Sequence, residues 1–187
     1  MQHSTTTYKL LGIDPGTNVL GYAIIEIRKK KIYLVQHGVL TLSHLDDHQL
    51  KLKRIFERIQ QLIDQYQPKE MAIEAPFFGK NVQSMLKLGR AQGVAIAAAI
   101  TKGVEMTEYA PKKIKQSVTG NGNASKEQVA AMLESILNQK LTQLSLDATD
   151  ALAAAVCHHY QTSSIFGKRS QYSGWKGFLS SNPDRVK

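Results

Sequence analysis

Apolar residues fill two short stretches near the start of the chain, Tyr8–Ile13 and Val19–Ile27, and return with partial alternation over Ile32–Leu40. Each run is long enough for a β-strand, and only a few polar residues separate one run from the next. Short connections of this kind predict an antiparallel meander of three strands. Lys29, Lys30 and Lys31 lie between the second and third runs and are expected at a solvated hairpin tip.

The spacing of the apolar residues changes to three and four over residues 47–66, which predicts an amphipathic helix. Asp46 or Asp47 can cap its start, and Pro68 closes it. The five residues Glu70–Glu74 then predict a short strand that leads into a proline-marked exit. An alternation of strands and helices therefore begins here, which is typical of an α/β protein.

A long helix is predicted from Asn81, its N-cap, to about Thr101. Its second half, Val94–Ile100, is apolar nearly all round, so it should be covered on two sides. One cover is the sheet, and the other is either a second subunit or the rest of the same chain. Small residues that recur every four positions would let another helix approach closely: Gly89, Gly93 and Ala97.

The remaining elements are a fifth strand at Val104–Tyr109 and three further helices. Pro111 suits the first turn of one helix, and Ser125 opens a Ser-Lys-Glu-Gln capping box at the start of the next. The last helix begins near Leu146, with Ser145 as its candidate cap. A Gly-Asn-Gly-Asn loop at 120–123 could hold a phosphate on its backbone N–H groups, although it lacks the Walker ending.

Charge and composition restrict the classes of function. The 187 residues include 24 Lys and Arg against 15 Asp and Glu, a net charge of +9, which favours a polyanionic partner such as nucleic acid. A single cysteine excludes an intrachain disulfide and a cysteine-rich zinc site. With neither a signal-peptide pattern nor an apolar run of about 20 residues, the expectation is a cytoplasmic protein without membrane contact.

Domain organisation follows from a change of composition after Tyr160. Residues 1–161 are expected to form one domain, and residues 162–187 a basic, flexible tail rich in serine and glycine. Aromatic residues interleave with basic ones in this tail. They suit stacking on bases or docking on a partner, and a tail without a specific role is the alternative.

Four carboxylates stand out by their positions. Asp14 ends the first strand before a Pro-Gly turn, where glycine is expected to take a positive φ, and Glu74 ends a strand before Pro76. Asp147 and Asp150 lie three apart, on one face of the first turn of the last helix. A satisfied turn aspartate and acids that complement a helix dipole are the structural alternatives. His158 and His159, at the far end of that helix, are expected to be surface or boundary residues.

A cluster of such carboxylates would repel itself unless divalent cations bound within it. Mg²⁺ prefers oxygen ligands and needs neither His nor Cys. Two ions about 4 Å apart can activate water and stabilise the leaving oxygen of a phosphodiester. Together with the basic charge, the four acids indicate a metal-dependent nuclease.

Four sequence blocks resemble the RuvC family of Holliday junction resolvases, within the ribonuclease H-like superfamily. They read LGIDPGT at 11–17, AIEAPF at 72–77, LKLGRAQG at 86–93 and DATDALA at 147–153. The resemblance covers about residues 8–160. It implies a five-stranded mixed sheet, three antiparallel strands followed by two parallel ones, flanked by helices.

The resemblance also implies a function. A homodimer, paired through the helix at 81–101, would nick two opposed strands of four-way junction DNA and leave 5′-phosphate ends, with branch-migration motor proteins as partners. Mg²⁺ would be the cofactor, two ions per site, with Mn²⁺ able to replace it. By motif position the catalytic and metal-binding acids are Asp14, Glu74, Asp147 and Asp150. Phe77 would stack on an unpaired base, and Lys115 and Lys126 would contact DNA; charge alone adds Lys112 and Lys113.

Two other functions remain possible from the sequence. The Asp-x-Gly-Thr turn also resembles the phosphate loop of sugar kinases and actin-like ATPases, which need two such domains where this chain supplies one. A junction-binding protein without chemistry is the other alternative. Acids that face DNA weaken binding unless a metal neutralises them, which argues against it.

Overall fold

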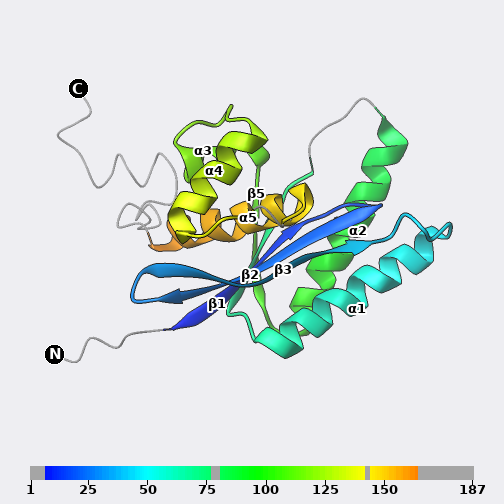
Figure 1. The fold of residues 1–187 in the computed structure, drawn as a ribbon. Helices are drawn as coiled ribbons and strands as arrows, with labels where there is room; N and C mark the ends of the chain where they lie inside the picture. Colours follow the sequence, from blue (N-terminus) through cyan, green and yellow to red (C-terminus); the bar gives the residue numbers. More distant parts are fainter. Residues whose placement is uncertain (1–6, 77–80, 142–143, 164–187) are drawn as a thin grey trace, which may run out of the picture.

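The computed structural model describes residues 7–76, 81–141 and 144–163. A five-stranded sheet is covered by helices on both faces (Figure 1). In chain order the elements are β1 (Tyr8–Asp14), β2 (Val19–Arg28), β3 (Lys31–Thr41), α1 (His48–Tyr66), β4 (Glu70–Glu74), α2 (Val82–Thr101), β5 (Glu105–Tyr109), α3 (Pro111–Thr119), α4 (Lys126–Leu137) and α5 (Leu146–Ser163).

The strands are arranged in the order β3-β2-β1-β4-β5. Strands β1, β2 and β3 form an antiparallel meander, and β4 and β5 add to it in parallel. The predicted mixed sheet is therefore confirmed. Because β1 and β4 are parallel neighbours with Ile13 opposite Ile73, their carboxyl ends lie side by side, which places Asp14 next to the end of β4.

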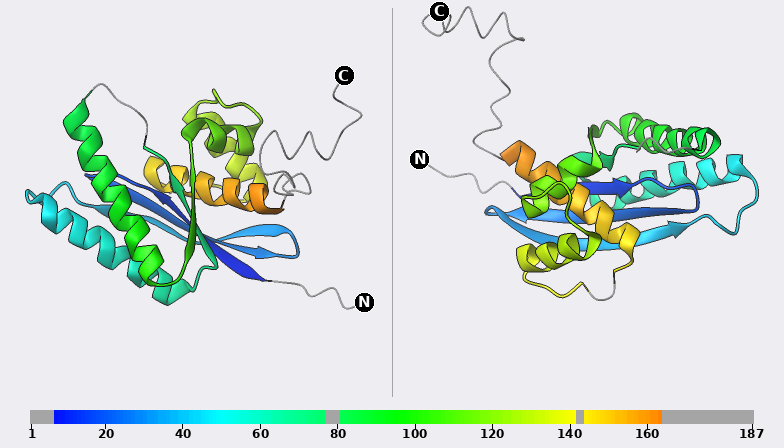
Figure 2. Two further views of the ribbon diagram at one scale, coloured as in Figure 1. Left: turned by 180° about the vertical axis from the view of Figure 1, so that it is seen from behind. Right: turned by 90° about the horizontal axis from the view of Figure 1, so that it is seen from above.

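Helices α1 and α2 lie together on one face of the sheet, and α5 lies on the other (Figure 2). Side chains alternate between the faces, so Leu11 and Ile13 of β1 pack under α1 and α2, whereas Leu10 packs under α5. The predicted caps are confirmed: Asp47 accepts a hydrogen bond at the start of α1, and Asn81 does so at the start of α2.

Helix α5 lies directly on β1 and β2 because two glycines leave room for it. A Cβ atom at Gly12 would stand 2.0 Å from the carbonyl oxygen of Ala151. A Cβ atom at Gly21 would stand 2.0 Å from the carbonyl oxygen of Asp147. Any side chain at either position would push the helix off the sheet. The height of α5 above the strands is thus set by these two residues.

The reason for glycine in the Pro-Gly turn differs from the expectation. Gly16 does not adopt a positive φ; Gly103 and Gly120 are the described glycines that do. A Cβ atom at Gly16 would instead stand 1.8 Å from the carbonyl oxygen of Val19. Close approach of the returning chain, not a left-handed conformation, therefore requires glycine after Pro15.

Helix α2 is buried on one side only. Its alanines Ala91, Ala95, Ala98 and Ala99 face the core. Val82, Leu86 and Ile100 on its outer side are 66%, 52% and 62% exposed. The prediction that the rest of the same chain covers the second side of this helix is therefore wrong. None of the described helices is both long and apolar enough to cross a membrane.

The expected surface position of His158 and His159 is also wrong, because both are buried. The His158 Nε2 atom shares a hydrogen bond of 2.6 Å with Glu70 Oε2, and its Nδ1 atom shares one of 2.8 Å with the Tyr109 hydroxyl. The His159 Nδ1 atom lies 3.1 Å from the Tyr8 hydroxyl. Partners far along the chain thus satisfy both rings inside the protein.

Candidate active site at the carboxyl ends of β1 and β4

Asp14 and Glu74 end neighbouring parallel strands and face the same side of the sheet. Asp14 shares its face of β1 with Gly12, which lies under α5. Glu74 shares its face of β4 with Ala72, which packs in the same core cluster as α5. Strand alternation therefore points both carboxylates toward α5.

The first turn of α5 brings Asp147 and Asp150 to this end of the sheet. The Ser145 hydroxyl accepts a hydrogen bond of 3.3 Å from the Ala148 N–H, as expected for the cap. The carbonyl of Asp147 rests on Gly21, and Gly21 is the residue paired with Asp14 across β1 and β2. The four predicted acids therefore come from three distant segments to one place.

Electrostatics show how strongly the acids interact. Burial, followed by repulsion from Glu74, Asp150 and Asp147, raises the pKa of Asp14 to about 8. Burial and the charge of Asp150 raise the pKa of Glu74 to about 7. A carboxyl held this far above its ordinary pKa lies in a negative and poorly solvated environment. These shifts indicate a site that is short of positive charge.

Lys126 supplies part of that charge. Its Nζ atom lies 2.6 Å from Asp150 Oδ2, and the pKa of Lys126 is raised chiefly by this hydrogen bond. The predicted capping box of Ser125 and Gln128 is present and fixes the helix start that carries the lysine. Spacing along the chain does not predict this contact, because Asp150 lies 24 positions after Lys126 and on a different helix.

A cavity of about 270 Å³ opens beside the acids. Among its lining residues are Glu74, Lys115, Lys126 and Asp150, so both lysines expected to contact DNA face the acid cluster. Lys112 and Lys113 lie on the exposed side of α3 and do not line it. Phe77 falls outside the described residues.

The chain leaves β4 along a fixed path. The N–H group of Ala75 donates a hydrogen bond of 2.9 Å to the Tyr109 carbonyl, which extends the pairing of β4 with β5 by one residue. The backbone is therefore paired with β5 both before and after Glu74 in the chain. This constrains the direction in which its carboxylate leaves the strand.

The donor set fits a hard divalent cation. All four acids offer oxygen atoms, which Mg²⁺ prefers. The raised pKa values of Asp14 and Glu74 indicate that a cation beside these two carboxylates would relieve the repulsion between the acids. Within the described ranges, no three His, Cys, Asp or Glu side chains already stand close enough to form a complete ligand group. In this arrangement Asp150 is paired with Lys126.

The loop at 120–123 is not a phosphate cradle, because its backbone N–H groups are already used. The Gly120 N–H donates to the Gln116 carbonyl, and the Gly122 N–H donates to the side chain of the same glutamine. The Asn121 and Asn123 N–H groups donate to the side chains of Thr119 and Asn121. This part of the sequence prediction is wrong.

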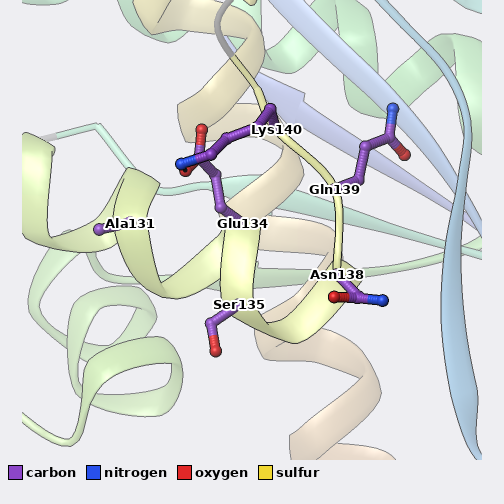
Figure 3. Close-up of a pocket in the computed structure, with 6 residues that line it drawn as sticks. All are labelled: Ala131, Glu134, Ser135, Asn138, Gln139 and Lys140. Carbon is purple, nitrogen blue, oxygen red and sulfur yellow. Dashed lines mark hydrogen bonds and ion pairs between the residues drawn. The ribbon is translucent and has the colours of Figure 1, made fainter.

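A larger cavity, of about 480 Å³, lies at the end of α4 and contains none of the four acids (Figure 3). Its charged groups satisfy each other, since Lys140 Nζ lies 3.1 Å from Glu134 Oε2 and the Leu141 N–H donates to the same carboxylate. Although this cavity is larger than the one beside the acids, its lining offers no group for the reaction.

Comparisons with known proteins agree with this arrangement. The sequence model of a family described as "Crossover junction endodeoxyribonuclease RuvC" matches residues 10–158. A protein of that name from Cytophaga hutchinsonii is 63% identical over 178 residues, covering 95% of this chain and 88% of the relative.

Two solved structures resemble the fold described above. The Thermus thermophilus RuvC structure has a TM-score of 0.76 and 31% identity, covering 82% of this chain and 95% of that one. A second, titled "T. thermophilus RuvC in complex with Holliday junction substrate", has a TM-score of 0.77 and 31% identity, covering 83% and 94%.

Proposed function

This chain belongs to the RuvC family of crossover junction endodeoxyribonucleases, and we propose that it resolves four-way DNA junctions by hydrolysing phosphodiesters in two opposed strands. The observation that carries the proposal is the meeting of Asp14, Glu74, Asp147 and Asp150 at one end of the sheet. Family membership supports the choice of a four-way junction among possible nucleic acids, since a related structure is titled as a complex with that substrate.

The four carboxylates are proposed to hold Mg²⁺, with Mn²⁺ as a substitute. A bound divalent cation supplies water activation and stabilises the leaving oxygen of the phosphodiester. The chain contributes a rigid base for the carboxylates: Asp14 and Glu74 on paired strands, and Asp147 on a helix seated on Gly21. This rigidity holds the acids in place with little reorganisation during the reaction.

Lys115 and Lys126 are proposed to neutralise backbone phosphates next to the acids. Both line the cavity together with Glu74 and Asp150, so a strand entering it would find two ammonium groups beside the carboxylates. If Asp150 were a metal ligand, Lys126 would be released from it and could contact a phosphate instead. We also assign Phe77 to stacking on an unpaired base, and Lys112 and Lys113 to outer phosphate contacts.

A homodimer is part of the proposal, because two opposed strands need two acid clusters. The outer side of α2 exposes Val82, Leu86 and Ile100. A Cβ atom at Gly89 or Gly93 would meet nothing within 4 Å, so the space above these two residues is open to a second α2. Action in the cytoplasm with branch-migration motor proteins completes the assignment.

The test is to compare a labelled mobile four-way junction with a linear duplex of the same sequence, each in Mg²⁺ or in EDTA. We expect paired, symmetric nicks with 5′-phosphate ends in the junction, and only with Mg²⁺. Equal cutting of the linear duplex would refute the proposed specificity for junctions. ATP turnover without any nicking would favour the kinase-like alternative instead.

A further inference from the structure

A second polar cavity, of about 230 Å³, lies at the same end of the sheet on the side of α1 and α2. Three separate segments line it: the turn between β1 and β2, the start of α1, and the first turns of α2. The lining residues are Thr17, Asn18, Asp46, His48, Lys51, Ser84 and Lys87. None of them belongs to the acid cluster.

The chemistry of this cavity suits an oxyanion. Lys51 and Lys87 outnumber the single acid, Asp46, and Thr17 and Ser84 add hydroxyl groups. His48 is the first residue of α1, and Ser84 is the third residue of α2, so the positive ends of two helix dipoles also converge here.

One ring nitrogen of a residue that lines the cavity has no hydrogen-bond partner among the residues that the structure describes. The Nε2 atom of His48 is buried and makes no hydrogen bond to any described residue. Such a buried polar atom is costly, so an oxygen atom from outside the chain would complete its hydrogen bonding. By contrast, Lys51 is already positioned, since its Nζ atom donates a bond of 3.1 Å to Asn18 Oδ1.

The cavity is tied to the acid cluster through the turn that follows Asp14. Thr17 and Asn18 lie three and four residues after that acid. The Asn18 carbonyl accepts a hydrogen bond of 2.7 Å from the Leu42 N–H, which pins the turn to the segment between β3 and α1. Asp14 faces α5 and the cavity lies on the other face, so one strand end separates the two sites.

We propose that this cavity binds a backbone phosphate of the DNA strand that passes over the end of β1, at a position away from the phosphate being cut. The inference rests on the proposed function as a junction nuclease. Lys51, Lys87 and His48 then act as positioning residues, because a phosphate held on one face of the sheet fixes how the same strand reaches the carboxylates on the other. Contacts of this kind set register and affinity without reading sequence.

The test compares two double variants of the full chain. Lys51→Gln with Lys87→Gln removes both cations of the cavity. Lys53→Gln with Lys102→Gln is the matched control: it removes the same charge from lysines that pair with Glu57 and Asp64 elsewhere. Junction affinity is measured by fluorescence anisotropy in EDTA over a series of salt concentrations, and urea unfolding verifies that each variant folds.

Loss of one phosphate contact should reduce the magnitude of the slope of log affinity against log salt by about 0.9. At about 0.1 M salt, this corresponds to an affinity about eightfold lower. We expect this from the cavity variant and not from the control. His48→Leu, which leaves both lysines in place, should weaken binding in the same direction. If the cavity variant matches the control in both affinity and slope, the inference is overturned.

Free phosphate is the other source of the same chemistry, and thermal unfolding with inorganic phosphate separates the two. Stabilisation of the wild type by inorganic phosphate, together with unchanged junction affinity in the cavity variant, would assign the cavity to a small anion and refute a DNA contact. If the wild type fails to cut junctions in Mg²⁺, the proposed function fails and this inference falls with it. If the wild type cuts junctions in Mg²⁺ but the cavity variant binds them as the control variant does, the proposed function stands and the phosphate contact is refuted.

Discussion

Replacing Asp14 with asparagine is expected to stabilise the protein in the absence of metal and DNA, although it should abolish junction cleavage. Burial and three neighbouring acids raise the pKa of Asp14 from 3.8 to about 8. A carboxyl whose pKa is higher in the folded state favours folding only when it is protonated. Its contribution is complete below pH 3.8 and is lost progressively as the pH rises to about 8.

The size of the effect follows from that window. At pH 7 the pH lies about three units above the unfolded pKa, and at about 1.4 kcal/mol per unit the upper bound is about 4 kcal/mol. Asp14 keeps some contact with solvent, so we expect a gain of about 2–4 kcal/mol for Asp14→Asn at pH 7. At pH 4.5 the same arithmetic leaves about 1 kcal/mol or less.

The assay is urea unfolding of wild type and Asp14→Asn in EDTA at both pH values. Glu105→Gln, which neutralises an exposed carboxylate of β5, is the matched control. Mg²⁺ should restore stability to the wild type at pH 7 and should do less for Asp14→Asn. Equal stability of the two proteins at pH 7, or a gain that does not depend on pH, would refute the reasoning that Asp14 lies in a strained acidic cluster.

Three further predictions concern single contacts. Lys126→Met removes the cation that lowers the pKa values of Asp14 and Glu74, so the pH profile of junction cleavage should shift to higher pH; an unchanged profile would contradict the contact. Gly21→Ala should cost about 2 kcal/mol or more in urea unfolding because its Cβ atom meets the helix backbone; an unchanged unfolding midpoint would contradict this close approach. Gly93→Arg should give a monomer in light scattering that nicks one strand at a time, whereas Gln61→Arg on the exposed side of α1 should stay dimeric; a dimeric Gly93→Arg would move the interface away from α2.

Local features of the fold could be predicted because local rules decide them. The apolar runs gave the strands, and the Asp47, Asn81 and Ser125 caps came from short-range hydrogen bonding. The mixed order of the sheet needed the family resemblance, because spacing along the chain does not reveal which strands pair in parallel.

The errors arose where distant residues decide the environment. His158 is buried because Glu70 and Tyr109, 88 and 49 residues away, satisfy both ring nitrogens. The amides of the glycine loop are taken by Gln116 and by neighbouring side chains, which composition does not show. The cavity lined by His48 could not be predicted from the sequence for the same reason, since its walls come from three separate segments.

The four carboxylates from three segments are proposed to form one metal site. Calorimetric titration of the DNA-free protein with Mn²⁺ tests it most directly, with wild type compared with Asp14→Asn, Glu74→Gln, Asp147→Asn and Asp150→Asn. We expect each substitution to weaken metal binding sharply, while Glu105→Gln should bind as the wild type does. Wild-type affinity in these four variants would contradict the four-carboxylate site.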